Sequence, residues 1–114
     1  MTEPTEQQQR QWDEQGYLVL EEAIRGDELG RLQQAFDHCA AACKDDWLNG
    51  IAKGDSTPTY YDIPNPLERD EIFIDLVDHE SWFGLLQRFT GGETLFLGPQ
   101  VRSVPPWPLS YTGW

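Results

Sequence analysis

The stretch Thr94–Pro106, "TLFLGPQVRSVPP", decides the fold class of this chain of 114 residues. Its first four residues form a short apolar run that predicts a strand, and the Gly-Pro pair after them predicts a turn or bulge. Residues 100–104 then alternate like a second strand, with Gln100 and Arg102 on one face. The two final prolines have no N–H group to donate, so they should end the ladder. We therefore expect the first strands of a sheet over about residues 93–104.

The residues after these strands are unusually apolar. Val104–Trp114, "VPPWPLSYTGW", contains three prolines, two tryptophans, a tyrosine and a leucine. A segment of this kind needs a partner surface or further chain to cover it. Only about three strands can be counted, and the last one runs directly into this segment. We therefore expect a larger sheet that has been cut short.

The N-terminal region predicts a helix followed by a strand. Thr5 and Gln8 have the spacing of a capping box for a helix over residues 5–15. Gly16 fits a left-handed stop for this helix. Tyr17–Leu20, "YLVL", is a continuous apolar run that predicts a buried strand.

A long amphipathic helix is predicted next. Asp27 is suited to its N-cap, and Asn49-Gly50 predicts its end. Its two cysteines are predicted to be small buried side chains, and neighbouring His38 does not complete a zinc site with them. Steps of three and four residues mark its apolar face, which consists of Leu29, Leu32, Phe36, Cys39, Cys43 and Trp47.

Residues 50–66 predict a long loop, because Gly, Pro, Asp, Ser and Asn punctuate them throughout. Loops of this length often carry function. Tyr60 and Tyr61 could line a substrate site here, or they could cover the edge of the core.

Two further helices are predicted over about residues 72–77 and 82–89, the second stopped by Gly91-Gly92. His79 lies at the junction between them, where a capping or surface histidine is expected. The helical region as a whole is expected to span about residues 5–90.

Composition and charge exclude several classes of function. The net charge is −12, from 20 acidic and 8 basic residues. Such a chain repels nucleic acid and anionic membranes, which are bound through Lys and Arg. No run approaches the roughly 20 apolar residues of a membrane span, and the polar, acidic N-terminus does not resemble a signal peptide. We expect a cytoplasmic protein with no nucleic-acid or membrane partner.

The residues alone indicate a soluble, acidic α+β domain with an unfinished sheet. There is no Gly-rich phosphate loop and no Ser-His-Asp motif. The many adjacent carboxylates carry almost no information in a chain this acidic.

Three stretches together resemble the start of the phytanoyl-CoA dioxygenase family. Gly16–Asp37, "GYLVLEEAIRGDELGRLQQAFD", is similar to the family's opening strand and acidic-capped helix. Ile74–Pro106, "IDLVDHESWFGLLQRFTGGETLFLGPQVRSVPP", resembles its next part, in which helices end in Asp-His and in Gly and a strand runs into Pro-Pro. Tyr111–Trp114, "YTGW", resembles the lead-in to the family's His-x-Asp iron motif.

The resemblance implies a fold and a place in it. Residues 1–114 would be the N-terminal part of a single oxygenase domain that ends just before the iron motif. The fold would be α+β, with the N-terminal helices packed on the first strands of a double-stranded β-helix (jelly roll, cupin-like). The chain does not complete this barrel, so its main partner would be the remainder of its own polypeptide.

The resemblance also implies a chemistry. Members use Fe(II) and 2-oxoglutarate, and the full-length protein would hydroxylate a small organic substrate. The iron is held by two His and one carboxylate, which leaves coordination positions open for 2-oxoglutarate and O₂. None of these ligands can be placed on this chain. We therefore expect that neither His38 nor His79 binds iron and that the 114 residues alone are inactive.

Some binding residues follow from the same resemblance. Gln100 matches a barrel-lining position that contacts 2-oxoglutarate, and Arg102 on the same face could bind its carboxylate bidentately. Alternatively, Arg102 could pair with one of the many acidic side chains. Members often have Lys before Pro-Pro, where this chain has Val104. Residues of the mouth of the barrel that could touch substrate, or else pack in the completed sheet, are Trp107, Tyr111 and Trp114.

A second interpretation belongs to another class. The chain could be a complete, non-catalytic acidic α+β module that docks on a partner protein through its aromatic C-terminal tail.

Overall fold

The computed structural model describes residues 3–54 and 60–104. More than half of the elements along the chain are helical, and the sheet is very small. In chain order the elements are α1 (Glu6–Gln15), α2 (Gly26–Lys53), β1 (Tyr61–Asp62), the 3₁₀ turn η1 (Pro66–Glu68), α3 (Glu71–Asp75), α4 (Phe83–Thr90) and β2 (Arg102–Ser103).

Helix α1 confirms the predicted caps. The Gln8 backbone N–H donates to Thr5 Oγ1 at 3.1 Å, and the Thr5 N–H donates to Gln8 Oε1 at 2.9 Å. These reciprocal bonds satisfy two backbone donors that the first helical turn would otherwise leave free. Gly16 ends the helix with φ 78°, a left-handed conformation that glycine adopts without a steric penalty.

Helix α2 is longer than the sequence predicted at both ends. Its N-cap is Arg25, so Asp27 lies in the first turn rather than at the N-cap. There the negative charge of Asp27 interacts favourably with the helix dipole. It also continues through Gly50 to Lys53 and ends at Gly54 with φ 81°. The predicted stop at Asn49-Gly50 is wrong because Ile51, one turn beyond Trp47, extends the apolar face.

The core lies where α3 and the segment before it pack against the middle of α2. Its buried members are Ala35 and Cys39 from α2 together with Ile63, Ile72 and Phe73. Both cysteines are free and buried, which confirms their predicted role as small core side chains. Burial raises the pKa of the Cys39 thiol, which keeps it protonated and unreactive.

Strands β1 and β2 form a two-residue antiparallel ladder that pairs Tyr61 with Ser103 and Asp62 with Arg102. One residue further along β1, the Ile63 N–H donates to the Val101 carbonyl at 3.0 Å. The first strands expected over about residues 93–104 are therefore present only at the end of that range.

Two predicted strands do not form in the described part of the chain. Tyr17–Leu20 and Thr94–Leu97 are both outside any strand, and Thr94–Leu97 is exposed throughout. Each segment has the apolar composition of a strand, but no neighbouring backbone is present to pair with it. A strand forms only with a partner, so composition alone misplaced both.

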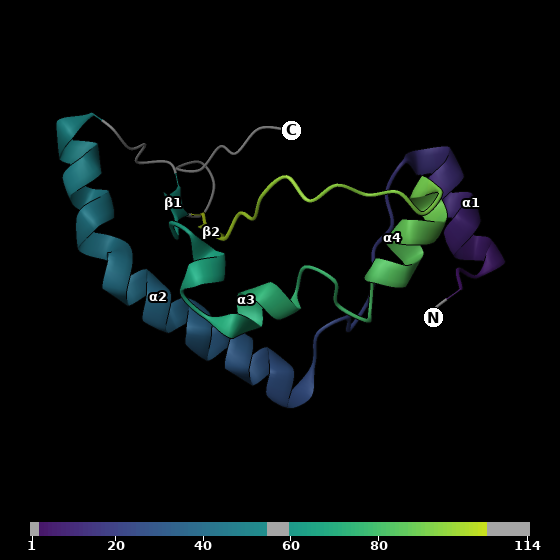
Figure 1. The fold of residues 1–114 in the computed structure, drawn as a ribbon, viewed down its shortest axis with the longest axis horizontal. Helices are drawn as coiled ribbons and strands as arrows, with labels where there is room; N and C mark the ends of the chain where they lie inside the picture. Colours follow the sequence, from purple (N-terminus) through teal and green to yellow (C-terminus); the bar gives the residue numbers. More distant parts are fainter. Residues whose placement is uncertain (1–2, 55–59, 105–114) are drawn as a thin grey trace.

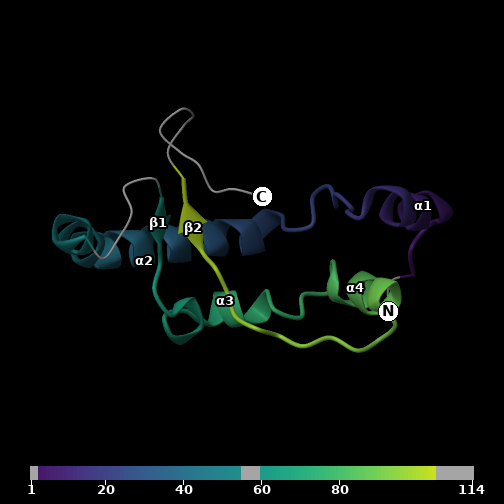
Figure 2. The ribbon, with the colours of Figure 1, turned by 90° about the horizontal axis from the view of Figure 1, so that it is seen from above.

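The helices form two rows that contact each other where α3 packs on α2 and where α1 packs on α4 (Figure 2). Helices α1 and α2 lie in one row, and α3 and α4 lie in the other. Helix α2 spans much of the long axis, while α1 and α4 pack together at the opposite end from β1 and β2 (Figure 1). The extents are 50 × 30 × 26 Å and the radius of gyration is 16.8 Å. A compact domain of this length would have a radius of gyration of about 13 Å, so the molecule is open and elongated.

Candidate functional site

Two groups hold the guanidinium of Arg102, which is one of the predicted site residues. Its Nε donates to Asp62 Oδ1 at 2.6 Å and its Nη2 donates to Asp62 Oδ2 at 2.9 Å. Its Cζ lies 3.5 Å from the centre of the Tyr60 ring, a cation–π contact. The hydrogen bonds to Asp62 raise the pKa of Arg102, so it is always charged. Pairing with an acidic residue, one of the two alternatives for Arg102, is therefore present.

Gln100 lies in a different environment from Arg102. It precedes β2 and is exposed, whereas the Arg102 side chain is only 18% exposed. The two-residue strand begins after Gln100, so the structure does not place Gln100 on a shared strand face with Arg102. A contact of either residue with 2-oxoglutarate remains a prediction.

Tyr60 and Tyr61 form one wall of a groove together with Trp47 on α2. The Trp47 ring meets Tyr61 edge-on at 5.4 Å and Tyr60 at a tilted 6.0 Å. The Tyr61 hydroxyl donates to the Ala40 carbonyl at 2.9 Å. Burial raises the pKa of Tyr61 to about 12. The two tyrosines pack on α2 and also line a cavity, and their contact with a substrate stays a prediction.

This cavity, the aromatic groove, has a volume of about 550 Å³. That volume falls in the range of small-molecule sites, which are mostly apolar with a few polar groups. The helical spacing places Trp47 on the apolar face of α2, but nothing local in the sequence links positions 47 and 60, so the contact of Trp47 with the tyrosines could not be predicted. The groove is lined by Ala40, Ala41, Lys44, Trp47, Leu48, Ile51, Tyr60, Tyr61 and Ser103.

The other predicted substrate residues, Trp107, Tyr111 and Trp114, lie outside the described residues.

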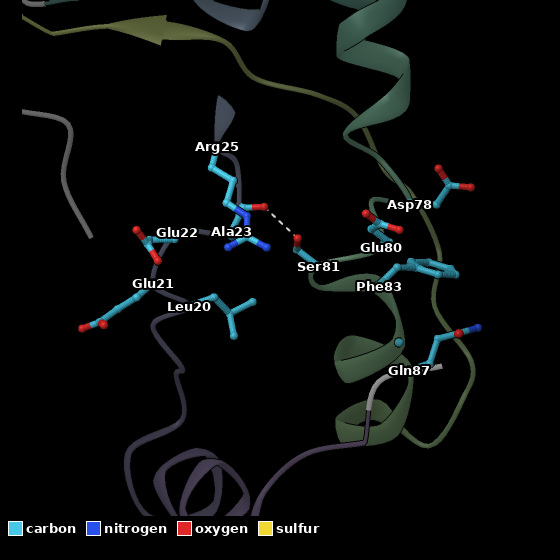
Figure 3. A pocket seen from close by; sticks show the side chains of 11 residues that line it. Leu20, Glu21, Glu22, Ala23, Arg25, Asp78, Glu80, Ser81, Phe83 and Gln87 are labelled. Carbon is cyan, nitrogen blue, oxygen red and sulfur yellow. Dashed lines mark hydrogen bonds between the residues drawn. The ribbon is translucent and has the colours of Figure 1, made fainter. Parts of the chain in front are cut away.

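A second cavity, the acidic cleft, opens between the Leu20–Arg25 segment and the start of α4 (Figure 3). Four acidic residues, Glu21, Glu22, Asp78 and Glu80, are among the residues that line it, together with Arg25. Ser81 Oγ donates to the Ala23 carbonyl at 2.7 Å across the cleft and ties its two walls together.

His79 connects the segment before α4 to the first turn of α2. Its Nε2 lies 2.7 Å from Glu28 Oε1, and its Nδ1 accepts the Ser81 backbone N–H at 3.0 Å. Because Nδ1 is an acceptor, Nε2 carries the proton and donates it to Glu28. The ring stacks on Trp82 at 4.4 Å. We call this arrangement of His79, Glu28, Ser81 and Trp82 the His79 clasp.

The clasp corrects the predicted role of His79. The predicted helix-capping role is wrong, because the N-cap of α4 is Trp82 without a side-chain bond, and His79 Nδ1 accepts the N–H of Ser81, which precedes the helix. A surface position is wrong, because the residue is only 7% exposed. Glu28 lies 51 positions away in the sequence, so no local pattern could reveal their contact.

Ser81, His79 and Glu28 do not form a hydrolase triad despite their residue types. A triad requires the serine hydroxyl to donate to the histidine ring. Here the ring accepts from the Ser81 backbone, and the hydroxyl donates to the Ala23 carbonyl instead. The arrangement stabilises the fold and provides no activated nucleophile.

The described residues do not fit an iron centre. Residues 3–54 and 60–104 contain no group of three or more His, Cys, Asp or Glu side chains arranged to hold a metal ion. His79 is committed to the clasp, and His38 lies exposed on α2.

Comparison with known proteins gives no match, whether with a family model, a curated protein or a solved structure. Among the described helices, none combines the length and the apolar character needed to cross a membrane.

Proposed function

We propose that residues 1–114 are the N-terminal part of a cytoplasmic Fe(II)- and 2-oxoglutarate-dependent dioxygenase of the phytanoyl-CoA dioxygenase family. The full protein would hydroxylate a small organic substrate. The proposal rests on the sequence resemblance, and it places the iron ligands outside these residues. Gln100 and Arg102 are the proposed 2-oxoglutarate contacts, although Arg102 would have to share its guanidinium with Asp62.

One structural observation supports this proposal above the others. Tyr17–Leu20, which the resemblance assigns to the family's opening strand, and Thr94–Leu97, which it assigns to the first barrel strands, are apolar and lie outside any strand in the described chain. Val19 is 67% exposed, and Leu95 and Leu97 are 82% and 91% exposed. Such composition is ordinary for a strand that packs in a sheet and unfavourable for a segment facing water.

The first test is the coding sequence downstream of the Trp114 codon. The proposal expects an open frame with a His-x-Asp motif within the next few residues. A frame that continues without that motif would remove the proposal.

The second test is enzymatic. The polypeptide encoded by the longer frame should convert 2-oxoglutarate to succinate when Fe(II) and O₂ are supplied, and the 114-residue chain should not. Substitution of the first His of the motif by Ala should abolish turnover in the longer protein. Failure of the intact protein to form succinate with any organic co-substrate would count against the proposal.

A further inference from the structure

The aromatic groove is built before any ligand arrives. Three rings form its wall, and separate contacts fix two of them. Tyr61 is held by its hydrogen bond to the Ala40 carbonyl, and Tyr60 lies against the guanidinium of Arg102. Asp62 in turn holds Arg102 through two hydrogen bonds. A wall held in this way loses little conformational entropy when a ligand binds.

The remaining lining residues determine the chemistry of the groove. Ala40 and Ala41 line the groove with short side chains, and Leu48 and Ile51 continue its apolar surface further along α2. Leu48 is 50% exposed, so much of its surface is available to a ligand. Flat apolar molecules suit such a groove, because offset or edge contacts with aromatic rings favour planar partners.

Among the residues that the structure describes, Lys44 is the only charged one that lines the groove. It lies one helical turn before Leu48 on α2, and it is exposed. Its acidic neighbours Asp45 and Asp46 follow at one and two positions, which in a helix face away from Lys44. In a chain with a net charge of −12, an apolar groove with a single ammonium group favours one acidic group on its ligand.

We propose that the aromatic groove binds a small molecule with a flat apolar body and one carboxylate, which Lys44 contacts. This assignment gives a substrate class for the oxygenase and in that respect rests on the proposed function. Binding itself needs neither iron nor 2-oxoglutarate, so it is tested separately from turnover.

The probe is 2-naphthoate, with 2-naphthamide as its uncharged match. The chain is titrated without metal, and the indole N–H signal of Trp47 is followed by NMR after assignment with Trp47→Phe. The naphthoate should shift this signal saturably and bind about fivefold more tightly than the amide, as expected for one exposed charge pair. Lys44→Gln should remove that preference. Lys53→Gln, which changes the other lysine of α2 outside the groove, should leave it unchanged.

Three results would overturn the proposal. The first is no saturable shift of the Trp47 signal. The second is a preference for the acid that survives Lys44→Gln while circular dichroism shows that the helices are intact. The third is a shift of the Trp47 signal that depends on protein concentration without added probe and persists when Leu95 and Leu97 are both replaced by Lys, which would assign the groove to contact between two copies of the chain.

Discussion

At the scale of single residues, long-range polar contacts hold the parts of this molecule in place. The Arg102–Asp62 pair connects β2 to β1 across 40 positions, and the His79–Glu28 contact connects the α4 end to α2 across 51 positions. Arg is suited to the first role because its planar fork meets a carboxylate with two parallel hydrogen bonds, which Lys cannot make. Both pairs lie beside cavities, so the same contacts shape the candidate sites.

Tyr61 provides a prediction on pH. Its pKa is raised by burial to about 12 in the folded chain, above the usual value of about 10. A raised pKa of the folded state adds stability that is complete below pH 10 and is lost as the pH rises through 12. The urea concentration at the midpoint of unfolding should therefore decrease as the pH is raised from 10 to 12.

The Tyr61→Phe variant should be less stable at neutral pH, since it loses the hydrogen bond to the Ala40 carbonyl. Its urea midpoint should decrease less between pH 10 and pH 12 than that of the original chain. Tyr17→Phe removes a tyrosine that is 56% exposed and should behave like the original chain. Tyrosinate absorbance during the same titration would identify the group. If the urea midpoint of Tyr61→Phe decreased as much as that of the original chain, Tyr61 would not be the group responsible for the pH dependence.

His79 provides a prediction on stability. His79→Ala removes the bond to Glu28, leaves the Ser81 N–H without its acceptor and loses the stack on Trp82. Loss of buried hydrogen bonds of this kind costs about 1–3 kcal/mol, which denaturant unfolding would measure. The matched control is His38→Ala, because His38 is exposed on α2 and should cost less than about 0.5 kcal/mol. Equal losses for the two variants would show that the clasp does not stabilise the fold.

At the scale of elements, the position at which α2 ends can be tested with two glycines. Gly54 has φ 81° at the C-cap, whereas Gly30 is inside the helix with open space where a Cβ would be added. Gly54→Ala should destabilise the chain by about 1 kcal/mol, because alanine is strained at positive φ. Gly30→Ala should stabilise it by up to about 1 kcal/mol through helix propensity. Thermal unfolding followed by circular dichroism would measure both. If α2 ended near Asn49, Gly54→Ala would have no effect.

The elements that sequence analysis placed correctly are those whose signals are local. The Thr5–Gln8 capping box and the left-handed glycines at positions 16 and 91 are fixed by neighbouring residues, so they could be predicted. The pairing of Tyr61 with Ser103 depends on residues far apart in the sequence, and it was not predicted. Tyr17–Leu20 and Thr94–Leu97 were assigned as strands on composition, which cannot supply the partner that a strand requires.

In the candidate site, too, the residues with a local signal in the sequence could be predicted and those that depend on distant contacts could not. Tyr60, Tyr61 and Arg102 were identified from the sequence, because an aromatic pair in a long loop and a cation in an alternating strand are visible locally. Asp62 and Trp47 complete the site, yet nothing in their own surroundings distinguishes them from other acidic or apolar residues. Only the packing of β1 on α2 brings them together.

At the scale of the whole molecule, the exposed apolar segments predict self-association of the 114-residue chain. Leu95 and Leu97 lie in extended backbone whose N–H and C=O groups have no ladder, and such an edge can pair with another copy. Sedimentation velocity should detect oligomers that increase with concentration. The double variant Leu95→Lys and Leu97→Lys should shift the chain toward monomer with the same helical content, because charges on an edge oppose pairing. Ile74→Lys changes a residue of α3 that is 48% exposed and should leave association unchanged. A chain that remains a single monomeric species at all concentrations would show that these segments do not need a partner, and it would also weaken the oxygenase proposal.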